Sequence, residues 1–484
     1  MTNKPRTNLF SVFTLILISS SSLAAEQPNN PTNKVLGSNQ TFAITHVNVI
    51  SMEKDKETIN NATVVIQDKK ILNINGEIPA NAEIIDGKNK WLIPGLIDMH
   101  VHTNASINFK GNQPTQGATF FMDTQYVMTT YVANGVTTVF ELDGRVAHFA
   151  QRNEIASGQV IGPRMALAPV INGGDQSNGG RIVNTASDAR QAVRSLKAEG
   201  YNFVKVYSHL NVESFEAVID EASKQGLKVV GHIPDAFKGK TAQAFVPHFG
   251  LVAHAEEYSK QIRNRNMTAQ DAEYFAEITK NNGTWVTPNL LALVSIANQA
   301  RSLDSIRTMD TLKYVHPILQ DKWLTSNQYH KNASPENIAY FERLIDFHKA
   351  LVKAFKKAGV PMLVGTDAGT SGILTGFSLH DELALLVEAG MTNEETLMAA
   401  TRLPAEWLGI EDTVGTVSVG KYADLILLNA NPLDDISNTR AIDGVFVNGT
   451  WLDKDQIDAM LLKLAKWNES MKDHYKWSNR KNYN

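Results

Sequence analysis

The stretch PGLIDMHVH, residues 94–102, decides how this sequence is interpreted. Pro94 and Gly95 mark a turn, and the apolar run after them ends in two histidines, His100 and His102. Side chains two residues apart on a β-strand point to the same side, so both imidazoles would project together near the strand's C-terminal end. Such a pair can clamp a metal ion, although two histidines on an exposed strand are equally consistent with no site at all.

Further apolar runs follow the first one and alternate with amphipathic helical stretches, a pattern typical of repeated β/α units around a parallel sheet. Counting the first, we recognise eight such runs, at residues 96–102, 137–143, 164–170, 203–208, 228–234, 251–257, 285–291 and 362–368. Eight units are the number that closes a barrel. The sequence therefore predicts an α/β fold, a (β/α)8 TIM barrel over residues 95–408.

The helical stretches carry recognisable end signals. Asn211 can cap a helix that stops at Gly226, and Thr392 with Glu395 forms a capping box ahead of another helix. The stretch at 300–358 is too long for one crossover connection. We expect it to form a lid or a side insertion.

Short β-branched runs flank the barrel on both sides, at residues 41–94 and 409–454. The ends of a closed barrel lie close together, so the two flanks are predicted to pair into one composite β-sandwich domain. Residues 26–40 are a polar leader, and residues 455–484 are expected to form an amphipathic helix and a tail.

Residues 1–25 have the layout of a secretory signal peptide. Lys4 and Arg6 precede an apolar run at 9–18, and small residues follow it. The run is too short to cross a bilayer, which takes about 20 residues, and no later run is long enough. We expect an exported protein, periplasmic or secreted, with no membrane contact after cleavage of the signal.

The overall composition excludes several classes of function. The chain has 46 basic and 50 acidic residues, and this slightly acidic balance argues against nucleic-acid binding. Cysteine is absent, so disulfides, thiolate metal sites and cysteine nucleophiles are excluded. Any metal must be held by nitrogen and oxygen ligands.

Single polar residues recur at the ends of other predicted barrel strands, namely His232, His254 and Asp367. Each alone is better interpreted as a satisfied core histidine or a capping aspartate. Together, however, they converge on the functional face of a barrel, where burying polar groups is costly unless a partner such as a metal is present. His209, His248 and His380 are interpreted as ordinary loop or helix histidines.

On these motifs the sequence resembles the amidohydrolase superfamily over nearly its whole length. The resemblance rests on PGLIDMHVH, the GTD at 365–367, GxxxxGKYADLILLN at 415–429, NPL and VFVNG, in the family's order. The subgroup it resembles most includes imidazolonepropionase-like proteins and exported dipeptidases that carry a lysine on barrel strand four. Here that position is Lys205.

The resemblance implies a site with two divalent cations. His100, His102 and Asp367 would hold one ion, His232 and His254 the other. Lys205, converted by carbon dioxide to a carbamate, would bridge them. A lysine that reaches from the barrel end to solvent is the alternative. Zinc is the expected metal, with manganese and cobalt as alternatives.

The implied chemistry is attack of a metal-bridging hydroxide on an amide or peptide-like carbonyl of a small substrate. Asp367 would act as the catalytic residue that moves the proton to the leaving amine. Tyr207, on the same face as Lys205, could bind the substrate carbonyl or simply fill the barrel interior.

Two alternatives to this function stay open. A mononuclear deaminase or imidazolonepropionase-type cyclic-amide hydrolase would leave Lys205 unused, and a pseudoenzyme would lack ligands. The sequence gives neither the substrate's identity nor the choice between a monomer and a homo-oligomer.

Overall fold

The computed structural model describes residues 40–103, 106–108, 119–174, 180–262 and 267–478. The predicted signal peptide at 1–25 and all but the last residue of the predicted polar leader lie outside these residues. Within the described part, no helix has the length and the apolar character needed to span a membrane.

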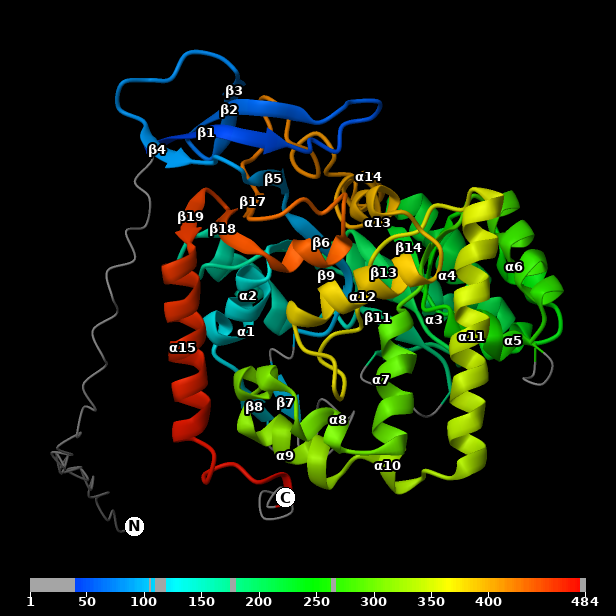
Figure 1. The fold of residues 1–484 in the computed structure, drawn as a ribbon. Helices are drawn as coiled ribbons and strands as arrows, with labels where there is room; N and C mark the ends of the chain where they lie inside the picture. The colour runs from blue at the N-terminus through cyan, green and yellow to red at the C-terminus, as the bar shows by residue number, and fades with distance from the viewer. Residues whose placement is uncertain (1–39, 104–105, 109–118, 175–179, 263–266, 479–484) are drawn as a thin grey trace, which may run out of the picture.

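Strands from the two ends of the chain pair in one eight-stranded sheet, drawn in Figure 1 with β1 to β4 at the top of the view. Its order is β19-β18-β17-β5-β1-β2-β3, and β4 pairs with β1. The strands are β1 (Thr41–Val49), β2 (Ile59–Gln67), β3 (Lys70–Ile74), β4 (Glu83–Asp86), β5 (Trp91–Pro94), β17 (Leu425–Leu428), β18 (Ile442–Val447) and β19 (Thr450–Asp453).

The junction between the two ends of the chain is the pairing of β5 with β17. The strands run antiparallel, with Ile93 opposite Ile426. One face of this sheet encloses its own apolar cluster, in which the ring of Phe42 from β1 meets that of Phe446 from β18 at 5.3 Å. Burial of apolar side chains from both ends therefore holds the sheet together.

Parallel strands form the centre of the molecule in two sheets, with orders β10-β9-β6 and β12-β11-β13-β14-β15-β16. They are β6 (Leu96–Val101), β9 (Val136–Glu141), β10 (Arg164–Leu167), β11 (Val170–Asn172), β12 (Arg181–Ile182), β13 (Phe203–Val206), β14 (Lys228–Gly231), β15 (Phe249–Ala253) and β16 (Trp285–Thr287).

The third predicted strand, residues 164–170, does not run unbroken. It ends as β10 at Leu167, and β11 begins at Val170 in the other sheet. Pro169 lies in the break, where it has no N–H to donate to a ladder. Its carbonyl still accepts a hydrogen bond from the Lys205 backbone at 2.9 Å.

Residues 362–368 do not form the continuous eighth strand that the sequence predicts. Met362 forms an isolated bridge with Val286 of β16, and Ala368 forms one with Val101 of β6. Between these bridges, the Leu363 N–H bonds to the Val286 carbonyl of β16 and the Val364 carbonyl accepts from Met99 N of β6, whereas the Val364 N–H bonds to the Ala399 carbonyl. The segment therefore lies between β16 and β6 without a regular ladder.

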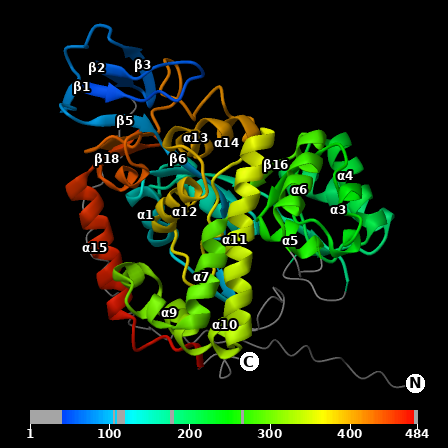
Figure 2. The same ribbon diagram turned by 45° about the vertical axis from the view of Figure 1, so that its right-hand side comes forward.

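Helices pack around the parallel strands, and Figure 2 shows α3, α4, α5 and α6 together on one side. The helices of this part are α1 (Thr124–Ala133), α2 (Val146–Ala156), α3 (Ala186–Ala198), α4 (Val212–Gln225), α5 (Glu256–Gln261), α6 (Ala269–Asn282), α7 (Leu290–Arg301), α12 (Phe377–Glu388), α13 (Asn393–Ala399) and α14 (Arg402–Leu408).

The predicted helix ends are confirmed. The Asn211 side chain accepts a hydrogen bond from Ser214 N at the start of α4, and Gly226 closes that helix in the left-handed conformation. Thr392 and Glu395 form the capping box of α13.

The long stretch at 300–358 forms several helices. They are α8 (Asp304–Arg307), the 3-10 helix η3 (Asp310–Tyr314), α9 (Pro317–Thr325), α10 (Gln328–Lys331) and α11 (Pro335–Ala358). The C-terminal helix α15 (Lys454–Ser470) follows β19 directly and packs against both α1 and η3. It is the red helix at the edge of Figure 1.

Candidate metal centre

The structure brings together the side chains of all six residues that the sequence singled out as metal ligands. His100 lies on β6, Lys205 lies on β13, and the others follow strands or lie in the irregular segment: His102 after β6, His232 after β14, His254 after β15, and Asp367 within 362–368. These positions follow directly from the chain order of parallel strands, whose C-terminal ends meet at one edge of the sheet.

Asp367 lies among three of the histidines. Its Oδ1 atom is 3.0 Å from His102 Nε2 and 3.3 Å from His100 Nε2. Its Oδ2 atom is 3.9 Å from His254 Nε2. His100 Nε2 is also 3.3 Å from Lys205 Nζ, so amine, imidazole and carboxylate share one small volume.

Ring contacts connect the remaining histidine to this group. The His254 ring stacks on His100 with centroids 4.7 Å apart, and it meets His232 edge-on at 4.9 Å. Two groups of donor atoms result, each within 4.8 Å: one from His100, His102 and Asp367, the other from His232, His254 and Glu257. The second group contains Glu257, which the sequence interpretation had not proposed.

Two of these residues have an uncommon backbone conformation. His254 has φ 74° and Asp367 has φ 62°, in the left-handed region that non-glycine residues seldom adopt. Strain of this kind persists where the surrounding structure fixes it, and it gathers at functional sites. In His254 this conformation occurs directly after β15, and in Asp367 it occurs within the irregular segment 362–368.

The electrostatics of the cluster favour the neutral, metal-binding form of three of its four histidines. Burial, together with the Lys205 charge, holds the pKa of His100 well below its ordinary value, and burial does the same for His232. Burial lowers the pKa of His254 to about 3. Neutral imidazole is the form that ligates metals. Burial also lowers the pKa of Lys205, although Asp367 and other carboxylates oppose the shift.

His102 and Asp367 form the charged pair of the group. Burial alone would lower the pKa of His102, but its contacts with Asp367 and Glu141 outweigh burial and raise the pKa to about 10. Burial would raise the pKa of Asp367, but the hydrogen bond and charge of His102 bring it below its ordinary value. Without a cation, His102 therefore takes a proton to balance the carboxylate.

An orphaned nitrogen atom tests whether a metal fits this cluster. Among the described residues, His232 Nε2 is buried and has no hydrogen-bond partner, whereas Nδ1 of the same ring faces Glu257. A buried polar atom without a partner costs free energy, and a cation that accepts an imidazole lone pair supplies one. Nitrogen and carboxylate donors within a few ångströms suit a divalent transition metal.

Two buried carboxylates orient the histidines. Glu257 Oε1 is 3.1 Å from His232 Nδ1, and its Oε2 accepts a hydrogen bond from Ile233 N at 3.1 Å. Glu141 Oε1 is 3.5 Å from His102 Nδ1. Both glutamates lie in predicted strand runs, 251–257 and 137–143, so a charged residue inside an apolar run was the signal that could have identified them.

Tyr207 lies beside the centre. Its ring stacks on His232 with centroids 4.0 Å apart, and Lys205 Nζ lies 5.5 Å from its centroid. This position is compatible both with contact to a substrate and with a packing role. His380, interpreted from the sequence as an ordinary histidine, lies buried on α12 and shares a 2.9 Å hydrogen bond with Thr439.

Curated proteins of known name are similar in sequence to this chain over most of its length. A 5-methylthioadenosine/S-adenosylhomocysteine deaminase of Bacillus cereus (strain AH820) is 22% identical over 448 residues, covering 84% of this chain and 92% of the relative. An imidazolonepropionase of Shewanella putrefaciens (strain CN-32 / ATCC BAA-453) is 23% identical over 401 residues, covering 76% and 86%.

Among solved structures, a putative prolidase from Bifidobacterium longum superposes with a TM-score of 0.63 at 22% identity, covering 88% of this chain and 100% of that one. This likeness concerns the fold. The model of the Amidohydrolase family matches residues 91–452, which include every residue of the two donor groups. The chain therefore belongs to the amidohydrolase family, whose members are metal-dependent hydrolases of carbon–nitrogen bonds.

Proposed function

We propose that this protein hydrolyses an amide or peptide-like bond of a small substrate at a centre of two divalent cations. The observation that carries the proposal is the pair of adjacent donor groups, with Asp367 in one and His232 in the other.

His100, His102 and Asp367 would hold one ion, and His232 with His254 would hold the second. Zinc fits this donor set, which has no sulfur. Lys205 would be a carbamate formed with carbon dioxide and shared by both ions, since burial favours its reactive, unprotonated amine. The bound cations would supply Lewis-acid chemistry, making water a better nucleophile and polarising the substrate carbonyl.

The residues of the chain itself move the proton and orient the substrate. Asp367, ionised at neutral pH, would take the proton of the attacking water and return it to the leaving nitrogen. Its position between three histidines keeps it within reach of both events. Tyr207 would donate a hydrogen bond to the substrate carbonyl from its place beside His232.

We further propose that the parallel strands close into a (β/α)8 barrel within residues 95–408. The isolated bridges at Met362 and Ala368 support closure, because they connect the last strand of one sheet to the first strand of the other. The flanks would form one composite β-sandwich domain. We propose export on the residue pattern of 1–25 alone.

A mononuclear deaminase or cyclic-amide hydrolase is the second candidate, because the two relatives named above are a deaminase and an imidazolonepropionase. In that case one ion would suffice and Lys205 would bind none. A pseudoenzyme is disfavoured because all six positions carry ligating residue types.

Metal analysis joined to a hydrolysis screen tests the proposal. We expect two ions per chain, and hydrolysis of at least one of the dipeptides, N-acyl amino acids or cyclic amides screened. His100→Ala and Lys205→Ala should each bind less metal, and their hydrolytic activity should fall at least about tenfold. His46→Asn, at an exposed histidine of β1, is the matched control.

The same experiment discriminates among the alternatives. One ion per chain, with activity that survives Lys205→Ala, would favour the mononuclear enzyme. Protein that binds no zinc, manganese or cobalt would refute the metal centre altogether.

A further inference from the structure

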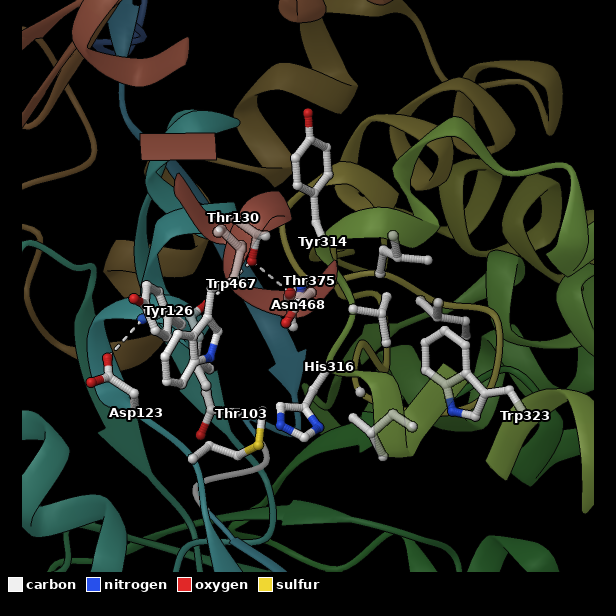
Figure 3. A pocket seen from close by; sticks show the side chains of 18 residues that line it. Thr103, Asp123, Tyr126, Thr130, Tyr314, His316, Trp323, Thr375, Trp467 and Asn468 are labelled. Atoms are coloured by element: carbon white, nitrogen blue, oxygen red, sulfur yellow. Dashed lines mark hydrogen bonds between the residues drawn. The ribbon is translucent and has the colours of Figure 1, made fainter. Parts of the chain in front are cut away.

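An apolar pocket lies next to the metal centre, between α1, α15 and the chain from η3 to α9 (Figure 3). Its volume is about 190 Å³. None of its lining residues belongs to the two donor groups, so the proposed chemistry leaves the pocket unexplained.

Chain connectivity places two residues of the pocket wall close to proposed metal ligands. Thr103, which directly follows the ligand His102, lines it, and so does Gly369, two residues after Asp367. Consecutive Cα atoms are about 3.8 Å apart, so each wall residue lies within roughly 7 Å of a ligand's Cα atom. A substrate with its scissile bond at the metals would have to extend only this short distance to place a neighbouring group in the pocket.

Aromatic and aliphatic side chains form most of the wall. Tyr126 of α1 and Trp467 of α15 are neighbours, with ring centroids 5.2 Å apart, and Trp323 contributes from α9. Figure 3 shows Trp467 and Tyr126 on one side of the view and Trp323 on the other. Leu319 and Leu464 add buried aliphatic surface.

Several polar groups of the wall are used within the protein. The hydroxyls of Thr130 and Thr375 share a hydrogen bond of 2.6 Å, and Asn468 Nδ2 donates to a backbone carbonyl at 2.9 Å. Among the described lining residues Asp123 is the acidic one, and its Oδ1 accepts from Tyr126 N as the cap of α1. These described residues include no lysine or arginine, so they offer no such cation to a carboxylate or phosphate.

The wall is supported from behind and open at its rim. Leu319, Trp323 and Leu374 belong to a buried apolar cluster that also contains Ile306 and Trp477. Trp467, by contrast, keeps 42% of its surface exposed. A large indole held half in solvent at the edge of an apolar hollow marks a surface that a ligand would cover.

We propose that this pocket binds a bulky, uncharged apolar group, aromatic or branched aliphatic, that flanks the scissile carbon–nitrogen bond of the substrate. The inference rests on the proposed hydrolytic function and specifies its substrate class. A dry apolar cavity of about 150 Å³ is enough to bind benzene. The larger volume here suits a phenyl or indole group, and aromatic walls favour a flat ring.

Binding to the resting protein is the first half of the test. Indole, titrated calorimetrically into the metal-loaded enzyme, should bind with 1:1 stoichiometry. Trp467→Ala should weaken indole binding about tenfold, because it removes an aromatic side chain from the pocket wall. Trp467 lies at the surface of α15, so the substitution leaves the core closed. Leu462→Ala is the matched control: Leu462 is 55% exposed on the same helix and does not line the pocket.

Substrate preference is the second half. We would measure kcat/KM for Xaa-Ala and Ala-Xaa dipeptides and for N-acetyl-Xaa, with Xaa as Gly, Leu, Phe or Trp. In at least one series kcat/KM should rise tenfold or more from Gly to Phe or Trp. Trp467→Ala should reduce that ratio about tenfold, and Leu462→Ala should leave it unchanged.

The outcomes separate the two proposals. Hydrolysis with no preference for bulky residues, or a preference that Trp467→Ala leaves intact, overturns the pocket assignment while the hydrolytic function stands. Indole binding unaffected by Trp467→Ala overturns it as well. Absence of hydrolysis in every series from metal-loaded enzyme overturns the hydrolytic function on these substrates and, with it, the substrate role of the pocket.

Discussion

Individual carboxylates orient the rings of two histidines of the metal centre, His232 and His102. His232 Nδ1 faces Glu257 and also shares a 2.7 Å hydrogen bond with Ser208 Oγ, which leaves Nε2 directed at the cluster. A second hydrogen bond of this kind fixes the tautomer and the ring orientation of a metal-binding histidine. Glu257 is therefore a positioning residue in our assignment, acting on the metal through His232.

Replacing Glu257 with glutamine should weaken metal binding without removing a proposed ligand. We expect Glu257→Gln to lower zinc affinity about tenfold or more, because orienting partners are typically worth 10- to 100-fold. Competition with a chelator measures it. Glu256→Gln is the control, since Glu256 is adjacent in sequence but half-exposed and paired with Lys260. Equal affinities in the two variants would contradict the positioning role.

At the scale of single strands, the sequence predicted which six side chains lie together but not the glutamates beside them; that the six bind metal stays a prediction. Period-two alternation placed His100 and His102 on one side of β6, and strand ends placed His232 and His254 beside them. Glu141 and Glu257 were missed because the sequence interpretation searched for recurring histidines and did not follow single glutamates inside apolar runs, although such a buried charge is itself a signal. The pocket was beyond prediction for another reason: α9 and α15 carry no motif, and only tertiary packing brings them together.

Close approach between β13 and β14 depends on a glycine. Gly231 has φ 139°, and a Cβ atom added to it would lie 2.1 Å from the carbonyl oxygen of Val206. Neither strand can move away easily, because the next residues in each, Tyr207 and His232, stack on each other at the metal centre. The backbone here requires the absence of a side chain.

Alanine at this position should therefore be far more destabilising than at an open glycine. We expect Gly231→Ala to lower the free energy of unfolding by more than about 3 kcal/mol, through both conformational strain and the backbone clash. Gly226→Ala, at the end of α4, has a positive φ but nothing within 4 Å of the added Cβ, and should cost about 1 kcal/mol. Urea unfolding midpoints would compare them, and equal midpoints would contradict the clash.

Strands from the two ends of the chain pair in the sheet that leads into the metal centre. β17 from the C-terminal part pairs with β5, which leads directly into β6 and its histidines. Helix α15 then runs from β19 to the apolar pocket, where Trp467 and Asn468 line the wall. The predicted domain boundaries stay a prediction, yet the pairing of strands from both flanks is observed.

Buried histidines outside the metal centre should make the stability of the whole fold sensitive to acid. His348 bonds to Ser259 Oγ at 3.1 Å and His380 to Thr439 Oγ1 at 2.9 Å, and burial lowers the pKa of each to about 3. In an unfolded chain histidine titrates near pH 6.5. Between those values the unfolded chain binds protons that the folded chain excludes.

The free energy of unfolding should consequently fall as the pH drops from about 6.5 toward 3. Each buried histidine contributes about 1.4 kcal/mol per pH unit well below pH 6.5, and nothing above it, where both states are neutral. His380→Gln should reduce the slope by that amount between pH 4 and 6, measured by urea unfolding. The exposed-site variant His46→Gln should leave the slope as it is. An unchanged slope in His380→Gln would argue against the burial effect.

The shared sheet also sets an order of events during synthesis. The ribosome releases β1 to β5 first, yet the partner of β5, around Ile426, emerges more than 300 residues later, given that β5 ends at Pro94. Until then one edge of the nascent sheet has unsatisfied backbone groups, a known liability for aggregation. Pairing across such a distance slows folding. This edge is therefore a natural place for a chaperone to hold the unfinished chain.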